Sequence, residues 1–220
     1  AIIVHISFWA LDWKYGELIY YQSKEVVTYS DLLSPAKDGG YLEYFEYILL
    51  IWCFILSALW VFINKFFKAI VIPFVYIYLF LDNCLVLHEH IGYQIKLNLF
   101  IKYNILVNQD IIRIQDISEL IYWLLIAIPI IFFSISFLRD KNKEKRSFVI
   151  TNLLLFFGMG FFGIICDFIG AIWYNFFYIN NSLFFVVFNA FIISIEEIGE
   201  ILIIAIACVW LFYLNFNYKI

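Results

Sequence analysis

Long apolar runs dominate the pattern of hydrophobic and polar positions along the chain. A bilayer core about 30 Å thick is crossed by a helix of about 20 apolar residues. Runs of that length with few charges occupy residues 46–64, 69–91, 119–138, 148–176 and 183–214. The shorter apolar stretch 1–11 is compatible with a sixth, truncated span. The pattern predicts an all-α polytopic transmembrane helix bundle, with residues 1–220 forming a single integral membrane domain.

Two longer segments separate these runs. Residues 12–45 carry turn signals at Ser34-Pro35 and Gly39-Gly40 and are too few to build a core of their own. Residues 92–118 alternate apolar and polar side chains, which favours an amphipathic helix at the membrane interface over a short hairpin.

Basic residues indicate the orientation of the spans. The stretch Arg139 to Arg146 holds five basic and two acidic residues, and Lys65 and Lys68 lie between the first two spans. By the positive-inside rule, loops 65–68 and 139–147 and the C-terminus are cytoplasmic, and segments 12–45 and 92–118 are external.

Composition agrees with a membrane protein and excludes other classes. The chain is 65% hydrophobic and 15% charged, far from the soluble average of roughly a quarter charged. Its net charge of −4 disfavours a nucleic-acid binder that works by neutralising phosphates. The four cysteines lie in apolar runs and are predicted to be reduced packing residues. The expected partner is the lipid bilayer, with other membrane subunits or a homo-oligomer left open.

Acidic residues inside the spans are the main candidates for function. A charged side chain at the bilayer centre costs about 3 kcal/mol on insertion scales, so such residues usually face a bundle interior and mark a functional site. The alternative for each is a protonated acid that makes one interhelical hydrogen bond. The acids within the predicted spans are Asp82, Asp167, Glu196, Glu197 and Glu200.

Depth and facing suggest that these acids meet. At about 1.5 Å per residue, Asp82 lies about 14 Å, Asp167 about 15 Å and Glu196 about 20 Å from the outer ends of their predicted spans. At about 100° per residue, Asp82 shares a helix stripe with Glu89, which lies near the outer surface. The predicted site is therefore a ladder of acids inside the bundle.

No Lys or Arg lies in the three spans that carry these acids. Neighbouring carboxylates cannot all stay ionised at low dielectric, so we expect either protons or a bound cation to neutralise them. Carboxylate and imidazole ligands on facing helices suit a divalent metal, here iron, manganese or zinc. However, six helical residues turn His88 about 120° away from Asp82. The candidate ligands are Asp82, His88, Glu89, Asp167, Glu196, Glu197 and Glu200.

The stretch Gly158-x-Gly160-x-x-Gly163 spells a dinucleotide-binding fingerprint but follows no strand and lies within a predicted span. We interpret these glycines as helix-packing residues instead.

The segments LDNCLVLHEH (81–90) and IEEIGEILIIAIACVWLF (195–212) resemble an uncharacterised family of bacterial multi-pass membrane proteins. In that family one span carries acids followed by a His-Glu pair, and a late span carries Glu-Glu-x-x-Glu. Here Asn83 stands where the family tends to have an acid, and Gly199-Glu200 only approximates its usual ending. The resemblance implies the same architecture and the same acids, but no reaction.

Two hypotheses follow. In the first, the chain is a small transporter or membrane metalloenzyme of the bacterial inner membrane, whose carboxylate and histidine cluster binds a divalent metal or relays protons. In the second, it is a non-catalytic subunit of a larger membrane complex whose protonated acids fix helix packing. Whether the chain is an enzyme is left open.

Overall fold

The computed structural model describes residues 41–102, 114–135, 137, 141–166, 168–169, 172 and 183–216. It describes no side chain for Tyr41, residues 183–190, 193 or 194. The predictions for span 1–11, for most of segment 12–45 and for Asp167 therefore lie outside the described residues. The chain divides into two compact units, 1–48 and 49–220, and the second unit contains the helix packing and the candidate site. The prediction of a single domain stays a prediction.

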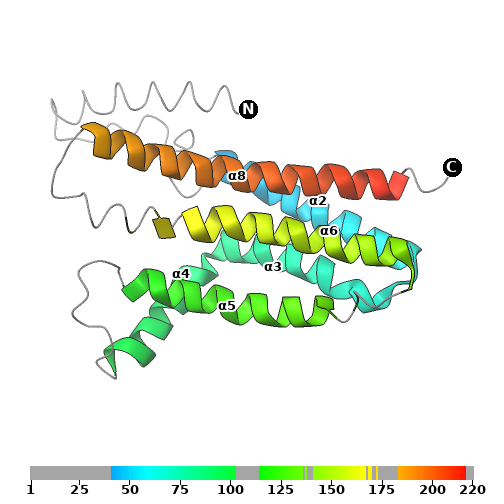
Figure 1. The fold of residues 1–220 in the computed structure, drawn as a ribbon, viewed down its shortest axis with the longest axis horizontal. Coiled ribbons are helices and arrows are strands. Elements are labelled where there is room, and N and C mark those ends of the chain that lie inside the picture. The colour runs from blue at the N-terminus through cyan, green and yellow to red at the C-terminus, as the bar shows by residue number, and fades with distance from the viewer. Residues whose placement is uncertain are drawn as a thin grey trace. The chain divides into compact units, whose positions relative to one another are not determined.

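The described residues form helices and contain no strand, which confirms the all-α prediction (Figure 1). The helices are α2 (Tyr41–Ile63), η2 (Phe67–Ile70), α3 (Val71–Leu85), α4 (Leu87–Ile95), η3 (Lys96–Ile101), α5 (Ile114–Ile135), α6 (Lys143–Gly160), η4 (Phe161–Cys166) and α8 (Leu183–Phe216). Within the second unit, α6 packs against α8 on one side and α5 on the other (Figure 1).

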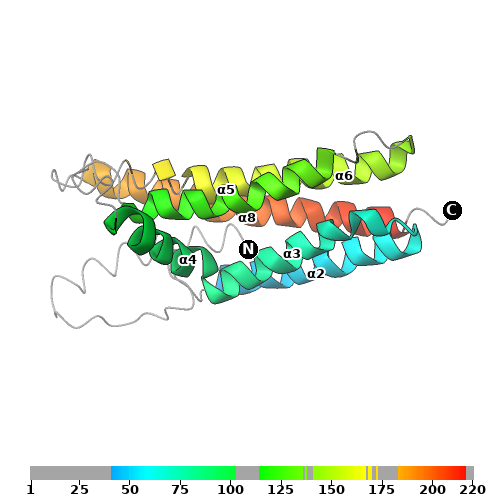
Figure 2. The ribbon, with the colours of Figure 1, turned by 90° about the horizontal axis from the view of Figure 1, so that it is seen from below.

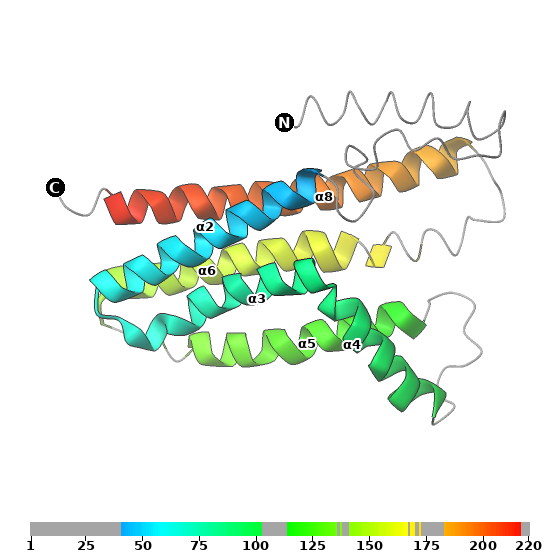
Figure 3. The same ribbon diagram turned by 180° about the vertical axis from the view of Figure 1, so that it is seen from behind.

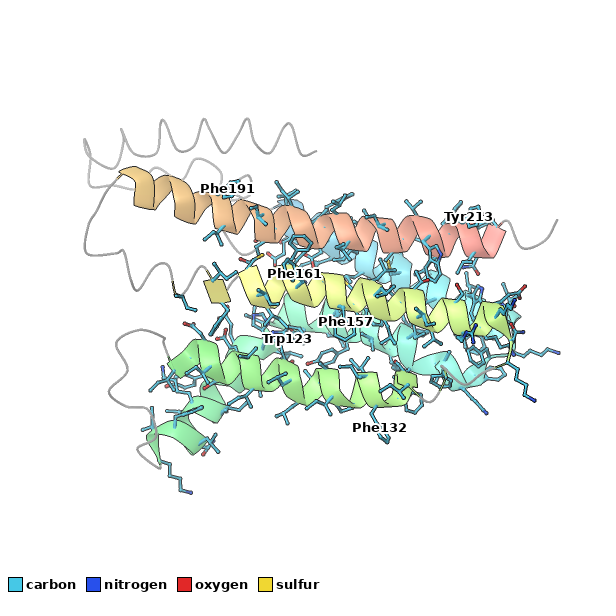
Figure 4. The ribbon with its side chains drawn as sticks, viewed as in Figure 1. Trp123, Phe132, Phe157, Phe161, Phe191 and Tyr213 are labelled. Carbon is cyan, nitrogen blue, oxygen red and sulfur yellow. The ribbon has the colours of Figure 1, made fainter. Side chains whose placement is uncertain are left out.

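Five helical stretches of the described residues are long and apolar enough to cross a membrane, which confirms the number of clear spans. They are Leu42–Ile63, Phe67–Leu85, Ile114–Ile135, Lys143–Cys166 and Ile195–Phe216. Large apolar side chains on their outer faces are exposed, among them Phe132 on α5 and Tyr213 on α8 (Figure 4). Such faces suit contact with lipid tails rather than water.

The predicted boundaries need three corrections. The second span ends at Leu85 instead of residue 91, because the helix breaks at Val86. The predicted segment 92–118 is not a single element, since α5 already begins at Ile114; residues 92–101 are helical, residues 103–113 lie outside the described part of the chain, and the external location stays a prediction. The loop 139–147 is shorter than predicted, because α6 begins at Lys143.

The core is built by α2, α3, α6 and α8. Trp60 of α2 stacks on Phe148 of α6 with ring centroids 3.8 Å apart, and the Cys53 thiol lies 3.7 Å from the carbonyl oxygen of Ile204 on α8. The buried Tyr76 hydroxyl donates a 2.8 Å hydrogen bond to Asn152 Oδ1. All four cysteines are free thiols; Cys53 and Cys166 are buried as packing residues, whereas Cys84 is exposed, so its predicted packing role is wrong.

Glycines allow close packing between the α6–η4 segment and α8. A Cβ placed on Gly158 would lie 3.2 Å from Ile203 Cδ1, tighter than ordinary contact. A Cβ on Gly163 would collide with the Glu200 carboxylate, and one on Gly199 would collide with the Phe162 ring. Gly158 and Gly163 thus act as packing residues, as expected from the sequence, and the described residues before them form no strand.

The two basic loops lie at the same end of the second unit. Lys145 Nζ lies 4.9 Å from the centroid of the Phe66 ring, a cation–π contact between the start of α6 and the turn before η2. The Asn142 side chain caps α6 by accepting hydrogen bonds from the backbone N–H groups of Glu144 and Lys145. The contact agrees with the prediction that both loops face one side of the membrane, while the identity of that side stays a prediction.

The glycine packing predicts a position-specific effect of added methyl groups. Gly199→Ala should destabilise the protein by about 1–3 kcal/mol, because the Phe162 ring must move to admit the new Cβ. Gly160→Ala is the matched control, since its Cβ would make an ordinary 3.7 Å contact with Ile164. Unfolding of the purified protein in mixed detergent micelles, followed by circular dichroism, measures both. Equal stabilities of the two variants would contradict this packing.

Candidate functional site

The centre of the candidate site is the carboxylate of Asp82, in the last turn of α3. Asp82 is 0% exposed. Its Oδ2 lies 2.9 Å from His88 Nδ1, and its Oδ1 accepts a 2.6 Å hydrogen bond from the Tyr122 hydroxyl of α5. Removing a carboxylate from water is costly unless donors satisfy its oxygens, and here each oxygen has a donor.

A second tyrosine extends this network. The hydroxyls of Tyr78 and Tyr122 are hydrogen bonded, and Tyr78 lies one helical turn before Asp82 on α3. Because Tyr122 uses its single hydroxyl proton for Asp82, Tyr78 is the donor in this pair. The result is a chain of hydrogen bonds from Tyr78 through Tyr122 to Asp82 and on to His88.

A backbone break brings His88 to Asp82. Val86 separates α3 from α4 and adopts a left-handed conformation, with φ 50° and ψ 44°. A β-branched residue in this region is strained, at a cost of about 1–3 kcal/mol. The expected 120° separation of His88 and Asp82 is therefore wrong, because it assumes a continuous helix. Figure 3 shows the change of direction, with α4 leaning away from the line of α3.

The break also changes the position of Asp82 in its span. With the span ending at Leu85, Asp82 lies three residues from the end, or about 5 Å along the helix, instead of the predicted 14 Å. His88 lies beyond that end, and 28% of its side chain is exposed. A partly exposed imidazole is thus hydrogen bonded to a fully buried carboxylate.

α4 is held by its packing on α5 (Figure 2). Gly92 is buried at this crossing, and a Cβ there would lie 2.6 Å from Glu119 Cγ. Gln115 Nε2 donates hydrogen bonds to Glu119 Oε1 at 2.6 Å and to the backbone carbonyl of Glu89 at 3.3 Å. These contacts fix the first turns of α4, and with them His88, against α5.

The surroundings of His88 favour its protonated form. Burial lowers the pKa of His88, but the hydrogen bond to Asp82 and the charges of Asp82, Glu119 and Glu89 raise it, and the net shift is upward from 6.5. The Trp123 ring of α5 lies beside the imidazole, with centroids 6.0 Å apart. By contrast, His90 is exposed, and its Nδ1 bonds the backbone carbonyl of Val86.

The other predicted site residues that the structure describes lie outside this hydrogen-bond network, although the charge of Glu89 is near enough to His88 to raise its pKa. Glu89 is exposed on α4. Glu196, Glu197 and Glu200 are half-buried on α8, and Glu200 lies against Gly163 of η4. Asp167 lies outside the described residues. Of the predicted set, the structure brings together Asp82 and His88.

The metal assignment gains no support from the described residues. Among them, no three His, Cys, Asp or Glu side chains are grouped so that they could hold a metal ion. Asp82 and His88 provide two ligands, while a divalent-metal site of the expected kind needs at least three protein ligands. The assignment of all seven residues to a metal site stays a prediction.

Sequence reasoning missed Tyr78, Tyr122 and Glu119. Tyr78 had a usable signal, because residues i and i+4 share a helix face and Asp82 is four residues later. No sequence signal pointed to Tyr122, because its contact with Asp82 depends on how α5 packs beside α3. Glu119 was assigned to the start of a span, and its position over Gly92 follows only from the α4–α5 crossing.

Comparison of the chain with protein-family models, with curated proteins and with solved structures finds no match. The site must therefore be interpreted from its own geometry.

The raised pKa of His88 predicts how stability depends on pH. A group whose pKa is raised by folding stabilises the protein fully below its ordinary pKa of 6.5, and that contribution is lost as the pH rises through the raised value. Melting temperatures of the detergent-solubilised protein should fall over this range. His88→Gln should remove this part of the pH dependence, and His90→Gln should retain it. If the melting temperatures of the wild type and His88→Gln changed equally with pH, the raised pKa of His88 would be contradicted.

Proposed function

We propose that the chain is a small proton-coupled transporter of the bacterial inner membrane, in which His88 and Asp82 exchange a proton. The observation that carries the proposal is the hydrogen bond between a fully buried carboxylate and a partly exposed imidazole at the end of a span. Buried ionisable groups within spans are typical of proton pathways in pumps and transporters.

Each residue has a defined part in the exchange. A hydronium ion at the membrane surface protonates neutral His88 at Nε2 and leaves a water molecule, and the resulting imidazolium gives the proton on Nδ1 to Asp82 Oδ2. The Nδ1–H bond breaks and its electron pair stays on nitrogen, while an O–H bond forms on the carboxylate. His88 becomes neutral with its proton on Nε2, and Asp82 becomes a neutral acid. Compared with the imidazolium–carboxylate pair, His88 has lost its positive charge and Asp82 has lost its negative charge.

The tyrosines hold the carboxylate ready for this exchange. Tyr122 donates to Oδ1 and so stabilises the ionised form, which leaves Oδ2 as the atom that takes the proton. Tyr78 keeps the Tyr122 hydroxyl oriented by donating to its oxygen. A preorganised donor reduces the rearrangement that each charge change would otherwise require.

Orientation is part of the proposal. Lys65 and Lys68 precede α3, whereas Asp82 lies at its other end. If the basic loops are cytoplasmic by the positive-inside rule, the Asp82–His88 pair faces the external side. Membership of the bacterial family that the sequence resembles would fit this arrangement, because the resemblance includes the segment 81–90.

A proton relay fits the geometry better than a metal centre, because the described site has two ligand side chains joined directly to each other. The subunit hypothesis, with acids that only fix packing, predicts no proton movement and is separated by the same experiment.

Proton flux through reconstituted protein tests the proposal. In liposomes containing a pH-sensitive dye, with the membrane potential clamped by valinomycin and potassium, the wild type should dissipate an imposed pH gradient at least about tenfold faster than Asp82→Asn. His88→Gln should be similarly slow, because it removes the proton donor. His90→Gln, on the same helix but without contact to Asp82, should match the wild type. Equal rates for Asp82→Asn and the wild type, with both folded, would disprove the proposal.

A further inference from the structure

The junction between α3 and α4 is a helix break without a helix-breaking sequence. No Pro or Gly lies between Phe74 and Ile91, and both neighbours of Val86, Leu85 and Leu87, are good helix formers. Among the non-glycine residues that the structure describes, positive φ angles occur at Lys65 and Val86. Lys65 lies in a turn between two helices, where such a conformation is common. The break at Val86 must therefore be held by contacts elsewhere in the fold.

Two sets of contacts hold it. The first is the His88–Asp82 hydrogen bond, which crosses the break directly. The second is the packing of α4 on α5 at Gly92, with the hydrogen bond from Gln115 to the Glu89 carbonyl. The left-handed conformation of Val86 is sterically strained. The bend therefore persists only while these contacts stabilise it by more than the strain energy.

The hydrogen bond and the bend depend on each other. In a continuous helix, six residues would turn His88 about 120° away from Asp82 and separate the pair. A bent chain is thus needed for the bond, and the bond opposes straightening. This mutual dependence gives the junction two arrangements, one with the pair joined and one with it apart.

From this coupling we infer that Val86 is a positioning residue and that residues 85–87 form a hinge, which is bent while His88 is bonded to Asp82 and straightens when that bond is lost. The inference rests on the proposed function, to which it adds a conformational response. A change in the pair would move α4 at the end of the span, which is the kind of motion that couples a proton to transport.

The distance between α3 and α4 tests the hinge. Nitroxide labels attached through p-acetylphenylalanine at Phe74 and Tyr93, both exposed, leave the native cysteines untouched. In a straight helix these positions lie about 28 Å apart along the axis, and the bend shortens that distance. Pulsed electron–electron double resonance in lipid nanodiscs should give a single short distance between the two labels of the wild type. His88→Gln and Asp82→Asn should each add a population near the straight-helix distance.

Glycine substitution provides the rescue. Val86→Gly removes the strain of the left-handed backbone, so in the His88→Gln background it should return most of the molecules to the short distance. Leu85→Gly in the same background is the matched control, because it adds a glycine one residue away at a position with ordinary helical angles, and should not rescue. If His88→Gln instead disrupts the local fold, neither glycine should restore the short distance between the labels.

The outcomes separate the hinge from the proton exchange. Unchanged distances in both His88→Gln and Asp82→Asn, or equal effects of the two glycines, would overturn the hinge. If distances stay fixed while Asp82→Asn abolishes proton flux, the proposed function stands without the hinge. If distances shift as expected while flux in the wild type equals that in Asp82→Asn, the hinge stands and the proposed function fails.

Discussion

The need to satisfy one desolvated carboxylate accounts for much of the local structure around α3, α4 and α5. Asp82 has no contact with solvent, so both of its oxygens need donors from the protein. Tyr122 reaches it from α5, and His88 reaches it from α4. The second donor is available only because the backbone is strained at Val86. The strain is thus the energetic cost of placing an imidazole against a buried acid.

The rest of the second unit supports this site with a rigid core. Aromatic stacking of Trp60 on Phe148 and the buried Tyr76–Asn152 hydrogen bond fix α2, α3 and α6 together. Glycines at Gly163 and Gly199 let η4 and α8 approach closely. The junction after α3 differs from this core, because α4 is short and rests mainly on α5. A rigid bundle with one strained junction at the end of a span is well suited to local movement.

The hydropathy pattern alone was sufficient for the helical class and for five spans, since crossing a bilayer imposes a strong constraint on length and polarity. It also singled out Asp82, because an acid in an apolar run is conspicuous. It did not reveal the break at Val86, where nothing local opposes a helix and tertiary contacts decide the backbone. The error propagated, because the depth of Asp82 and the angle to His88 were both calculated for a continuous helix. Tyr122 joins the site from a distant part of the chain, and no spacing rule links it to Asp82.

The central claim is that Asp82 and His88 share a proton as one unit. Solid-state NMR of the protein in lipid bilayers, with ¹⁵N-labelled histidine and ¹³C-labelled aspartate assigned through the single variants, observes both groups directly. The account predicts that the ring nitrogen signals of His88 and the carboxyl signal of Asp82 change together over one pH range, which lies above the ordinary histidine pKa of 6.5. Ring nitrogen signals of His88 that change with pH while the carboxyl signal of Asp82 stays constant would contradict it.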